Sequence, residues 1–357
     1  MSNATLHIRN LGSFFVGGQE YEISGQPTFE TTIAKGCTPS RLDPNGQFEA
    51  GQMYVQFIEL EQPQARWPLV FVHGGGMTGA CWETTPDGRP GMHHYFLRHG
   101  HNTYVCDGVE RGRASWAQYP HIYAGQPQFR TKQQAWESFR FGPNYPTREV
   151  WPGQQFPVEA FDIFMKQAVP RWTCNDALAE AAYAALLAKL GKSVILAHSQ
   201  GCGQILNVVQ QHPERVAAVI LLEPSGAPDT AGVDLTQLRD IPFLVIWGDN
   251  LDAGETWWPE FYRNVTAWAG KLSQANVPVT WLELPKLGIH GNSHILIMDR
   301  NADDIAALIQ NWMSQQGLLH FTALLPEGDN NDDRIGSMAS TQQDVVDTLV
   351  DFSDFLP

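Results

Sequence analysis

The chain has 357 residues, of which 43% are hydrophobic and 17% charged, so it can bury a core large enough for one big domain with insertions. Its formal net charge of −15 would repel other polyanions, which argues against a nucleic-acid or membrane surface as a partner and favours a small-molecule substrate. The first ten residues hold no apolar signal core, and no stretch reaches the length of a membrane span. We therefore expect a soluble protein, cytoplasmic as the sequence is written, or secreted or periplasmic if a signal peptide has been removed.

The order of the apolar runs predicts an α/β fold. The N-terminal part, which includes MYVQFIEL at 53–60, alternates apolar and polar residues between glycine-rich turns, as antiparallel edge strands do. From Pro68 onward, short apolar runs recur with helical segments between several of them, which is typical of parallel strands joined by crossover helices. The clearest helices are expected at 175–190, 201–212 and 302–316. The fold is therefore expected to be a mostly parallel central sheet with helices on both faces.

One core domain is expected from residues 1–113 and 175–316, interrupted by an insertion at 114–174. The insertion carries Trp, Tyr or Phe at thirteen positions, interleaved with prolines. Flexible linkers are poor in aromatic residues, so we interpret this segment as a cap, or lid, over a site. The acidic stretch 317–357 is expected to be a solvated tail, with a docked helix at TQQDVVDTLVDF (341–352) as the alternative.

Neither the cysteines nor the histidine-rich segment predicts a metal site. The five cysteines are scattered without a C-x-x-C pair, which favours buried free thiols, although a disulfide between two of them stays open. Histidines cluster in GMHHYFLRHGH at 91–101, a segment that we interpret as a helix and its following turn with the histidines at the surface. No matching carboxylate or cysteine set accompanies them. We expect no metal and no organic cofactor.

A serine at a strand-to-helix junction carries the signature of a nucleophile. The apolar run SVILA leads directly into HSQGCG and then into a helix. Ser199 is therefore expected at a sharp turn, with its hydroxyl above the sheet and beside the N–H groups that begin the helix. Such a turn needs small residues two positions before and after the serine, and here Ala197 and Gly201 occupy them.

A glycine-rich turn, VHGGGMTG at 72–79, follows a strand expected to lie beside the Ser199 strand. Such a turn can present backbone N–H groups to a developing oxyanion. We assign the two donors to the N–H groups of Gly75 and Gln200, with Gly76 as the alternative to Gly75. His73, close to the strand end, is expected to brace this loop.

A base and an acid are available on loops after later strands. His290 and His294 both lie in LGIHGNSH, and His294 is preferred because the apolar ILIM that follows would anchor it. Glu223 ends the buried run VAAVILL, where a carboxylate is rare and would either mark a solvated strand end or serve chemistry. Asp249 and Asp252, in IWGDNLD, are the alternative acids.

Taken together, VHGGG, AHSQG and GNSH resemble the α/β-hydrolase superfamily over about residues 50–316. More narrowly, TGACWETTPDGRPG, ERGRAS, LLEPSG and LGIHGNSH resemble a subgroup of bacterial and fungal esterases. In that subgroup the triad acid is a glutamate at the end of the sixth strand, which implies Glu223 here in preference to Asp252. Several of its members form dimers, which implies a homodimer by analogy.

A serine, a histidine, an acid and two N–H donors predict acyl transfer to water. We expect a serine hydrolase that cleaves carboxylic esters with an apolar or aromatic part. A lactonase that opens a cyclic ester would use the same machinery and is the nearest alternative. A non-catalytic binding module on the same fold is the alternative from a different class. Because His294 must be neutral to act as a base, activity should rise with pH through its titration.

Overall fold

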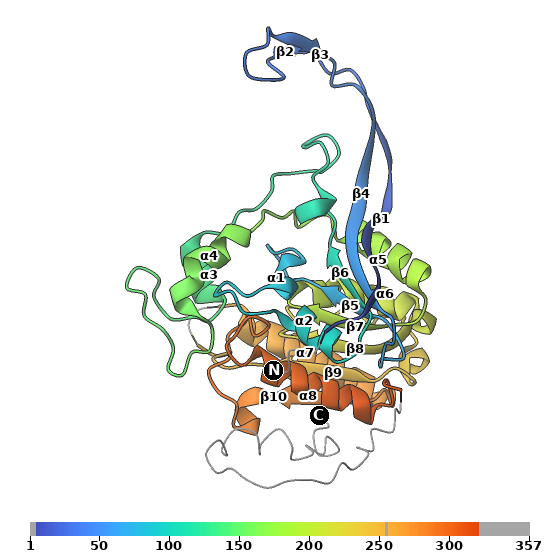
Figure 1. The fold of residues 1–357 in the computed structure, drawn as a ribbon, viewed down its shortest axis with the longest axis vertical. Coiled ribbons are helices and arrows are strands. Elements are labelled where there is room, and N and C mark those ends of the chain that lie inside the picture. The colour runs from blue at the N-terminus through green and yellow to red at the C-terminus, as the bar shows by residue number, and fades with distance from the viewer. Residues whose placement is uncertain (1–4, 254–255, 321–357) are drawn as a thin grey trace.

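The computed structural model describes residues 5–253 and 256–320, which form an eight-stranded sheet with helices on both faces (Figure 1). The strands follow the order β1-β4-β6-β5-β7-β8-β9-β10 across the sheet. The first three in this order pair antiparallel, and all later neighbours pair parallel, which confirms the expected sheet. The strands are β1 Ile8–Ile23, β4 Gly46–Leu60, β5 Leu69–Val72, β6 Thr103–Asp107, β7 Ser193–His198, β8 Val216–Leu222, β9 Phe243–Trp247 and β10 Val279–Glu283.

Helices connect the parallel strands and lie close to the expected positions. The α-helices are α1 Ala80–Glu83, α2 Met92–Arg98, α3 Lys132–Ser138, α4 Phe161–Phe164, α5 Asp176–Leu190, α6 Gln200–Gln211, α7 Trp258–Gln274 and α8 Ala302–Gln315. Short 3-10 turns are η1 Gly112–Ala114, η2 Val158–Ala160, η3 Met165–Gln167, η4 Pro213–Arg215, η5 Leu235–Leu238 and η6 Leu284–Leu287. The helices expected at 201–212 and 302–316 each begin and end within one residue of α6 and α8.

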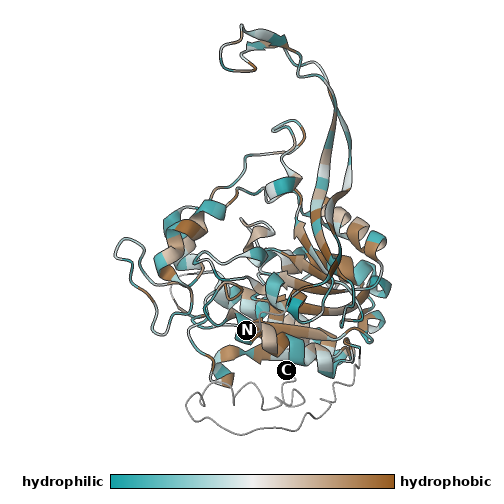
Figure 2. Ribbon diagram, viewed as in Figure 1, coloured by the Kyte–Doolittle hydropathy of each residue, from teal (hydrophilic) through white to brown (hydrophobic). Residues whose placement is uncertain are grey.

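The central strands are apolar on both sides because both faces of the sheet are covered (Figure 2). In β5, Leu69 and Phe71 join one core cluster with side chains of α2 and α8, whereas Val70 and Val72 join the opposite cluster with α5, α6 and α7. This division follows from the two-residue period of a strand. It explains why these strands read as continuous apolar runs rather than alternating ones.

An arm projects from the body at the antiparallel edge of the sheet (Figure 1). β1 and β4 pair along their whole length, from Ile8 with Leu60 to Ile23 with Gly46, and continue past the sheet as a two-stranded ribbon. The small hairpin of β2 Phe29–Thr31 and β3 Ser40–Leu42 forms its tip. The sequence predicts these edge strands but not their extension away from the core.

The segment 114–174 runs between β6 and α5 and includes α3 and α4. Most of its aromatic side chains pack on one another and on the body, as Trp136 does on Phe161 and as Phe141 does in a stack on Phe156 with ring centroids 4.0 Å apart. The aromatic density therefore builds the interior of this segment rather than a linker. Its boundaries as a cap stay a prediction.

Some expectations on single residues were wrong, and others concern residues outside the described part of the chain. His93 and His101 are buried rather than at the surface, because α2 packs against α8 and β6, and they bond Thr103 and Gln310. All five cysteines are free, but Cys37 and Cys174 are exposed, so the expectation of buried thiols is correct only for the other three. The expected helix at 341–352 and nearly all of the acidic tail lie outside the described residues. Within the described residues, no helix combines the length and apolar character needed to cross a bilayer.

Candidate active site

Ser199 lies at the junction of β7 and α6 in a strained backbone conformation. Its φ of 53° and ψ of −123° are rare for a residue with a side chain and cost on the order of 1–3 kcal/mol. The turn is tight enough that a Cβ on Gly201 would lie 2.5 Å from the carbonyl oxygen of His73. A Cβ on Gly74 would lie 2.9 Å from that of Ser199. Only glycine fits at either position, which explains why Gly201, two positions after the serine, has no side chain.

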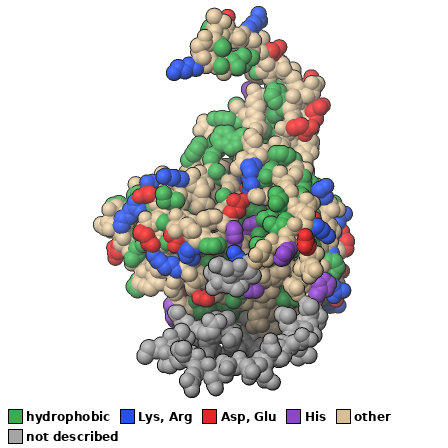
Figure 3. Space-filling model, viewed as in Figure 1, with side chains coloured by type: hydrophobic (Ala, Val, Ile, Leu, Met, Phe, Trp, Pro, Cys, Tyr) green, Lys and Arg blue, Asp and Glu red, His purple; other side chains and the backbone are tan. Residues whose placement is uncertain are grey.

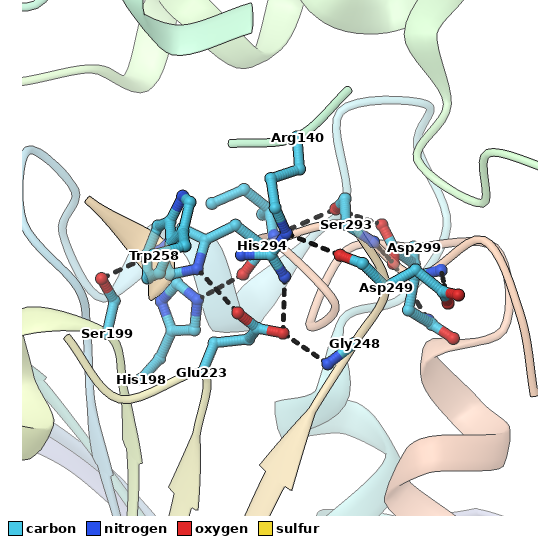
Figure 4. Close-up of polar contacts among 12 residues, drawn as sticks. Arg140, His198, Ser199, Glu223, Gly248, Asp249, Trp258, Ser293, His294 and Asp299 are labelled. Atoms are coloured by element: carbon cyan, nitrogen blue, oxygen red, sulfur yellow. Dashed lines mark hydrogen bonds and ion pairs between the residues drawn. The ribbon is translucent and has the colours of Figure 1, made fainter. Parts of the chain in front are cut away.

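His294 connects Ser199 to Glu223 (Figure 4). Its Nε2 lies 2.9 Å from the Ser199 hydroxyl oxygen, and its Nδ1 lies 3.3 Å from Oε2 of Glu223. All three residues are buried. In the neutral tautomer with the proton on Nδ1, the ring donates to the carboxylate and accepts from the serine hydroxyl. The three residues thus form one continuous chain of hydrogen bonds.

The other candidates are placed away from this chain of hydrogen bonds. His290 is 65% exposed, and its Nδ1 lies 3.6 Å from Oδ1 of Asp249. The second carboxylate oxygen of Asp249 accepts from the N–H of Asn292. Asp252 is exposed. Neither aspartate has a hydrogen bond or ion pair with His294 among the described residues, whereas Glu223 has one.

Glu223 is fully buried, so it is not a solvated strand end. It follows β8, the sixth strand of the large sheet in chain order, and its φ of 52° turns the chain sharply after the strand. Its Oε1 accepts from the N–H of Gly248 at 2.5 Å and from Nη2 of Arg140 at 2.7 Å, which leaves Oε2 for His294. The carboxylate is thereby fixed in one orientation.

Arg140 comes from the segment 114–174 and is a site residue that the sequence analysis missed. Like its partner Glu223, it is almost completely buried. Its Nε donates to the carbonyl oxygen of Asp249, and its guanidinium lies 4.9 Å from the ring centroid of Trp258. The preceding residue, Phe139, accepts a hydrogen bond from the N–H of His294 at 3.0 Å. The inserted segment therefore holds both the acid and the histidine.

His198 is a second site residue that the sequence analysis missed, although it stands directly before Ser199. Its Nε2 donates to the carbonyl oxygen of His294 at 2.8 Å, and its ring lies 4.8 Å from the His294 ring. Burial and, next in size, the nearby His294 lower the pKa of His198 to about 3, so His198 stays neutral and positions the backbone of His294.

Burial also holds the pKa of His294 well below its usual range. The guanidinium groups of Arg140 and then Arg130 lower it further, because a second positive charge nearby is unfavourable. His294 is therefore neutral, and able to accept a proton, over a wider range of pH than an exposed histidine.

The loop that carries His294 is braced by Asp299. One carboxylate oxygen of Asp299 accepts from the N–H of Ser293 and from the Asn292 side chain, and the other accepts from the Ser293 hydroxyl. Burial raises the pKa of Asp299 to about 7 even though the three hydrogen-bond donors lower it. The ILIM run after His294 is fully buried, as its anchoring role predicts.

The glycine-rich loop lies against the start of α6. Gly75 lines a cavity of about 250 Å³ together with Ser199, Gln200 and His294, whereas Gly76 lines a neighbouring depression that does not include the serine. Nε2 of His73 accepts from the N–H of Gly108, and its Nδ1 donates to the carbonyl oxygen of Gly74, which holds the loop in place. The two assigned N–H donors, those of Gly75 and Gln200, therefore belong to residues that line the same cavity as the nucleophile.

Aromatic side chains form part of the cavity wall. Phe139, Trp257, Trp258 and Phe261 line it, and the ring of Trp258 lies 4.1 Å from that of His294. In the described part of the chain, no group of three His, Cys, Asp or Glu side chains is arranged to hold a metal ion.

Comparison with known proteins identifies the family. The family model of the alpha/beta hydrolase fold matches residues 68–276, which is more than half of the chain. The chain belongs to the α/β-hydrolase family. A solved structure described as a novel bacterial esterase is 33% identical to this hydrolase, covers 88% of it and 98% of its own chain, and superposes with a TM-score of 0.75. A "Probable secreted lipase phiG" from Fungal sp. (strain ATCC 74256) is 27% identical over 323 residues, which cover 76% of this hydrolase and 88% of that protein. The expected fold and superfamily are confirmed.

Proposed function

We propose that the protein is a serine hydrolase of carboxylic esters in which Ser199, His294 and Glu223 act as a catalytic triad. The observation that carries this proposal is the hydrogen-bond chain from the Ser199 hydroxyl through His294 to Glu223, at the wall of a cavity. The relatives named as an esterase and a lipase support the same reaction class. Asp249 and Asp252, the alternative acids, have no hydrogen bond or ion pair with His294 in the described part of the chain.

The proposed reaction has two steps. As the Ser199 oxygen attacks the ester carbonyl, its proton moves to Nε2 of His294, and the departing alkoxide then takes that proton and leaves as the alcohol. A water molecule gives a proton to the same Nε2 and attacks the acyl-enzyme, which releases the carboxylic acid and restores the serine. Glu223 accepts the Nδ1–H and stabilises the imidazolium that forms in each step.

The oxyanion of each tetrahedral intermediate is proposed to bind the N–H groups of Gly75 and Gln200. Both residues line the serine cavity, and the second lies at the N-terminus of α6, where the helix dipole favours negative charge. Losing one such donor typically costs about 2.7–4 kcal/mol of transition-state stabilisation.

The substrate is proposed to be an ester with an apolar or aromatic part. Four aromatic side chains line the cavity, namely Phe139, Trp257, Trp258 and Phe261, and they would favour such a group over a fully polar one. A lactonase would use the same residues and stays the nearest alternative.

The relative named as secreted supports the proposal that this protein is secreted, which fractionation of the producing cells would test.

Serine-directed labelling tests this proposal. A fluorophosphonate should modify Ser199 in the wild type, identified by peptide mass, and the Ser199→Ala variant should stay unlabelled. Hydrolysis of p-nitrophenyl esters of increasing chain length, compared with aromatic esters and lactones, would then define the substrate. Turnover of lactones alone would favour the lactonase. Folded wild type that neither reacts with the probe nor hydrolyses any ester would favour a binding module and end the proposal.

A further inference from the structure

We infer that the ester substrate carries an anionic group, of carboxylate type, which Arg130 and Arg171 bind beside the reacting ester. This inference rests on the function proposed above and narrows its substrate class. Both arginines come from the segment 114–174, and both line the cavity that contains Ser199 and His294. They also line the adjoining depression of about 420 Å³, so they lie where the two hollows meet.

Within the described residues neither arginine forms an ion pair with a carboxylate, although Asp176 and Glu110 attract Arg171 from a longer distance. One donor of Arg130 bonds the Ser138 hydroxyl at 2.7 Å, and one donor of Arg171 bonds the side-chain oxygen of Gln200 at 2.9 Å. A guanidinium has five N–H donors in one plane, so each keeps donors for a further acceptor. Two positive charges with neutral partners thus face the cavity of a protein whose net charge is −15.

Elsewhere the chain neutralises its buried guanidinium groups. Arg140 pairs with Glu223 at 2.7 Å, and Arg111 pairs with Glu110 at 3.3 Å. The contrast matters because a partly buried charge without a partner is unfavourable and is expected mainly where a ligand will compensate for it. Burial and, to a smaller extent, repulsion by Arg171 lower the pKa of Arg130 to about 10. A bound anion would relieve that repulsion.

The aromatic contacts of the arginines are compatible with anion binding. The guanidinium of Arg130 lies 4.6 Å from the ring centroid of Phe139, an arrangement that uses its flat face and leaves the in-plane donors. A Cβ on Gly75 would lie 2.7 Å from Nη1 of Arg171, so this cation stands directly beside the glycine-rich loop. A carboxylate held there would be within a few bonds of the carbonyl that Ser199 attacks. An aromatic ester with a carboxylate substituent fits both the wall and the charges.

Matched pairs of esters test the inference. On the alcohol side, 4-acetoxybenzoate is compared with 4-acetoxybenzamide, and on the acyl side methyl 4-carboxybenzoate is compared with methyl 4-carbamoylbenzoate. Each pair replaces the carboxylate by a neutral amide of nearly the same shape. Values of kcat/KM are measured at pH 8, where His294 is neutral, because removing a cation also changes its titration.

We expect the carboxylate to be preferred by about tenfold to a hundredfold in at least one pair, the gain typical of charge-assisted hydrogen bonds. Arg130→Gln and Arg171→Gln should each remove most of that preference, read as the ratio of kcat/KM between the two members of a pair measured in the same variant. Arg148→Gln is the control, because Arg148 also stacks on aromatic rings of the same segment but pairs with Asp162 outside the cavity. It should leave the preference unchanged.

Benzoate and benzamide give a second readout that needs no turnover of the test esters, because each can slow fluorophosphonate labelling of Ser199. Benzoate should protect better than benzamide, and the difference should disappear in both arginine variants. Equal protection, together with equal kcat/KM within both ester pairs, would overturn the inference and leave the esterase proposal intact. A folded wild type that the fluorophosphonate does not label would instead contradict the proposed function itself.

Discussion

Replacing Arg140 by methionine should lower the stability of the protein and move the acid limb of its kcat/KM to higher pH. Its Nη2 lies 2.7 Å from Oε1 of Glu223, and both side chains are almost completely buried. For unit charges about 3 Å apart and an effective dielectric constant of about 20, Coulomb's law gives an attraction of about 5–6 kcal/mol. Desolvation offsets much of this gain, but removing one partner leaves the other charge buried alone. We expect Arg140→Met to lower the free energy of unfolding by about 3–5 kcal/mol.

Urea denaturation of four proteins measures this effect: wild type, Arg140→Met, Glu223→Gln and the double variant. The double variant should recover most of the lost stability, because no unpaired charge then remains in the core. It should not recover activity, since Glu223 is still missing. Arg140→Lys keeps the charge without the paired fork of donors and should fall between wild type and Arg140→Met.

The pH profile gives an independent readout of the same contact. Arg140 is one of the two cations that lower the pKa of His294, so its removal should raise that pKa. The acid limb of kcat/KM, which rises as His294 loses its proton, should therefore move to higher pH in Arg140→Met. Unchanged urea midpoints together with an unchanged acid limb would refute the buried ion pair.

Three further predictions follow from the geometry. In the wild type the acid limb of kcat/KM should have its midpoint below pH 6.5, because burial and two cations lower the pKa of His294; a midpoint above 6.5 would contradict the desolvated base. Gly201→Ala should abolish activity, because the added Cβ would lie 2.5 Å from the His73 carbonyl oxygen. The control is Gly203→Ala, whose added Cβ would have no atom within 4 Å. This variant should keep its activity and stabilise the helix by about 1 kcal/mol, measured by thermal melting. Apolar side chains such as Phe29 and Ile33 are exposed at the tip of the arm and could pair two copies of the chain (Figure 3). Light scattering should then give twice the monomer mass. A monomer at micromolar concentration would count against the homodimer.

The sequence predicts the site residues that lie at the carboxyl ends of strands. Ser199 and Glu223 each come directly after a mostly apolar strand, and the carboxyl ends of parallel strands share one edge of the sheet. His294 could be preferred over His290 because the buried ILIM run follows it. The turn at Ser199 depends on its neighbours in the chain, so local sequence is enough to place it.

The sequence could not place residues whose role depends on distant parts of the chain. Arg140 lies in an irregular segment and meets Glu223 across 83 positions, so no spacing or period connects them. The lack of a matching carboxylate or cysteine set predicts surface positions for His93 and His101, but the apolar residues Met92 and Phe96 direct their face of α2 toward the core. The length of the arm was not evident either, because paired strands outside a core have the same alternating pattern as edge strands.

The most direct test of the triad compares kcat/KM for a p-nitrophenyl ester among Ser199→Ala, Glu223→Gln and Asp252→Asn, each normalised to folded protein by circular dichroism. Ser199→Ala should be inactive, and Glu223→Gln should lose activity on the order of 10⁴-fold, as loss of a triad carboxylate does. Asp252→Asn, at an exposed position, should stay within about threefold of wild type. A loss in Asp252→Asn equal to or larger than the loss in Glu223→Gln would contradict the Ser199–His294–Glu223 triad.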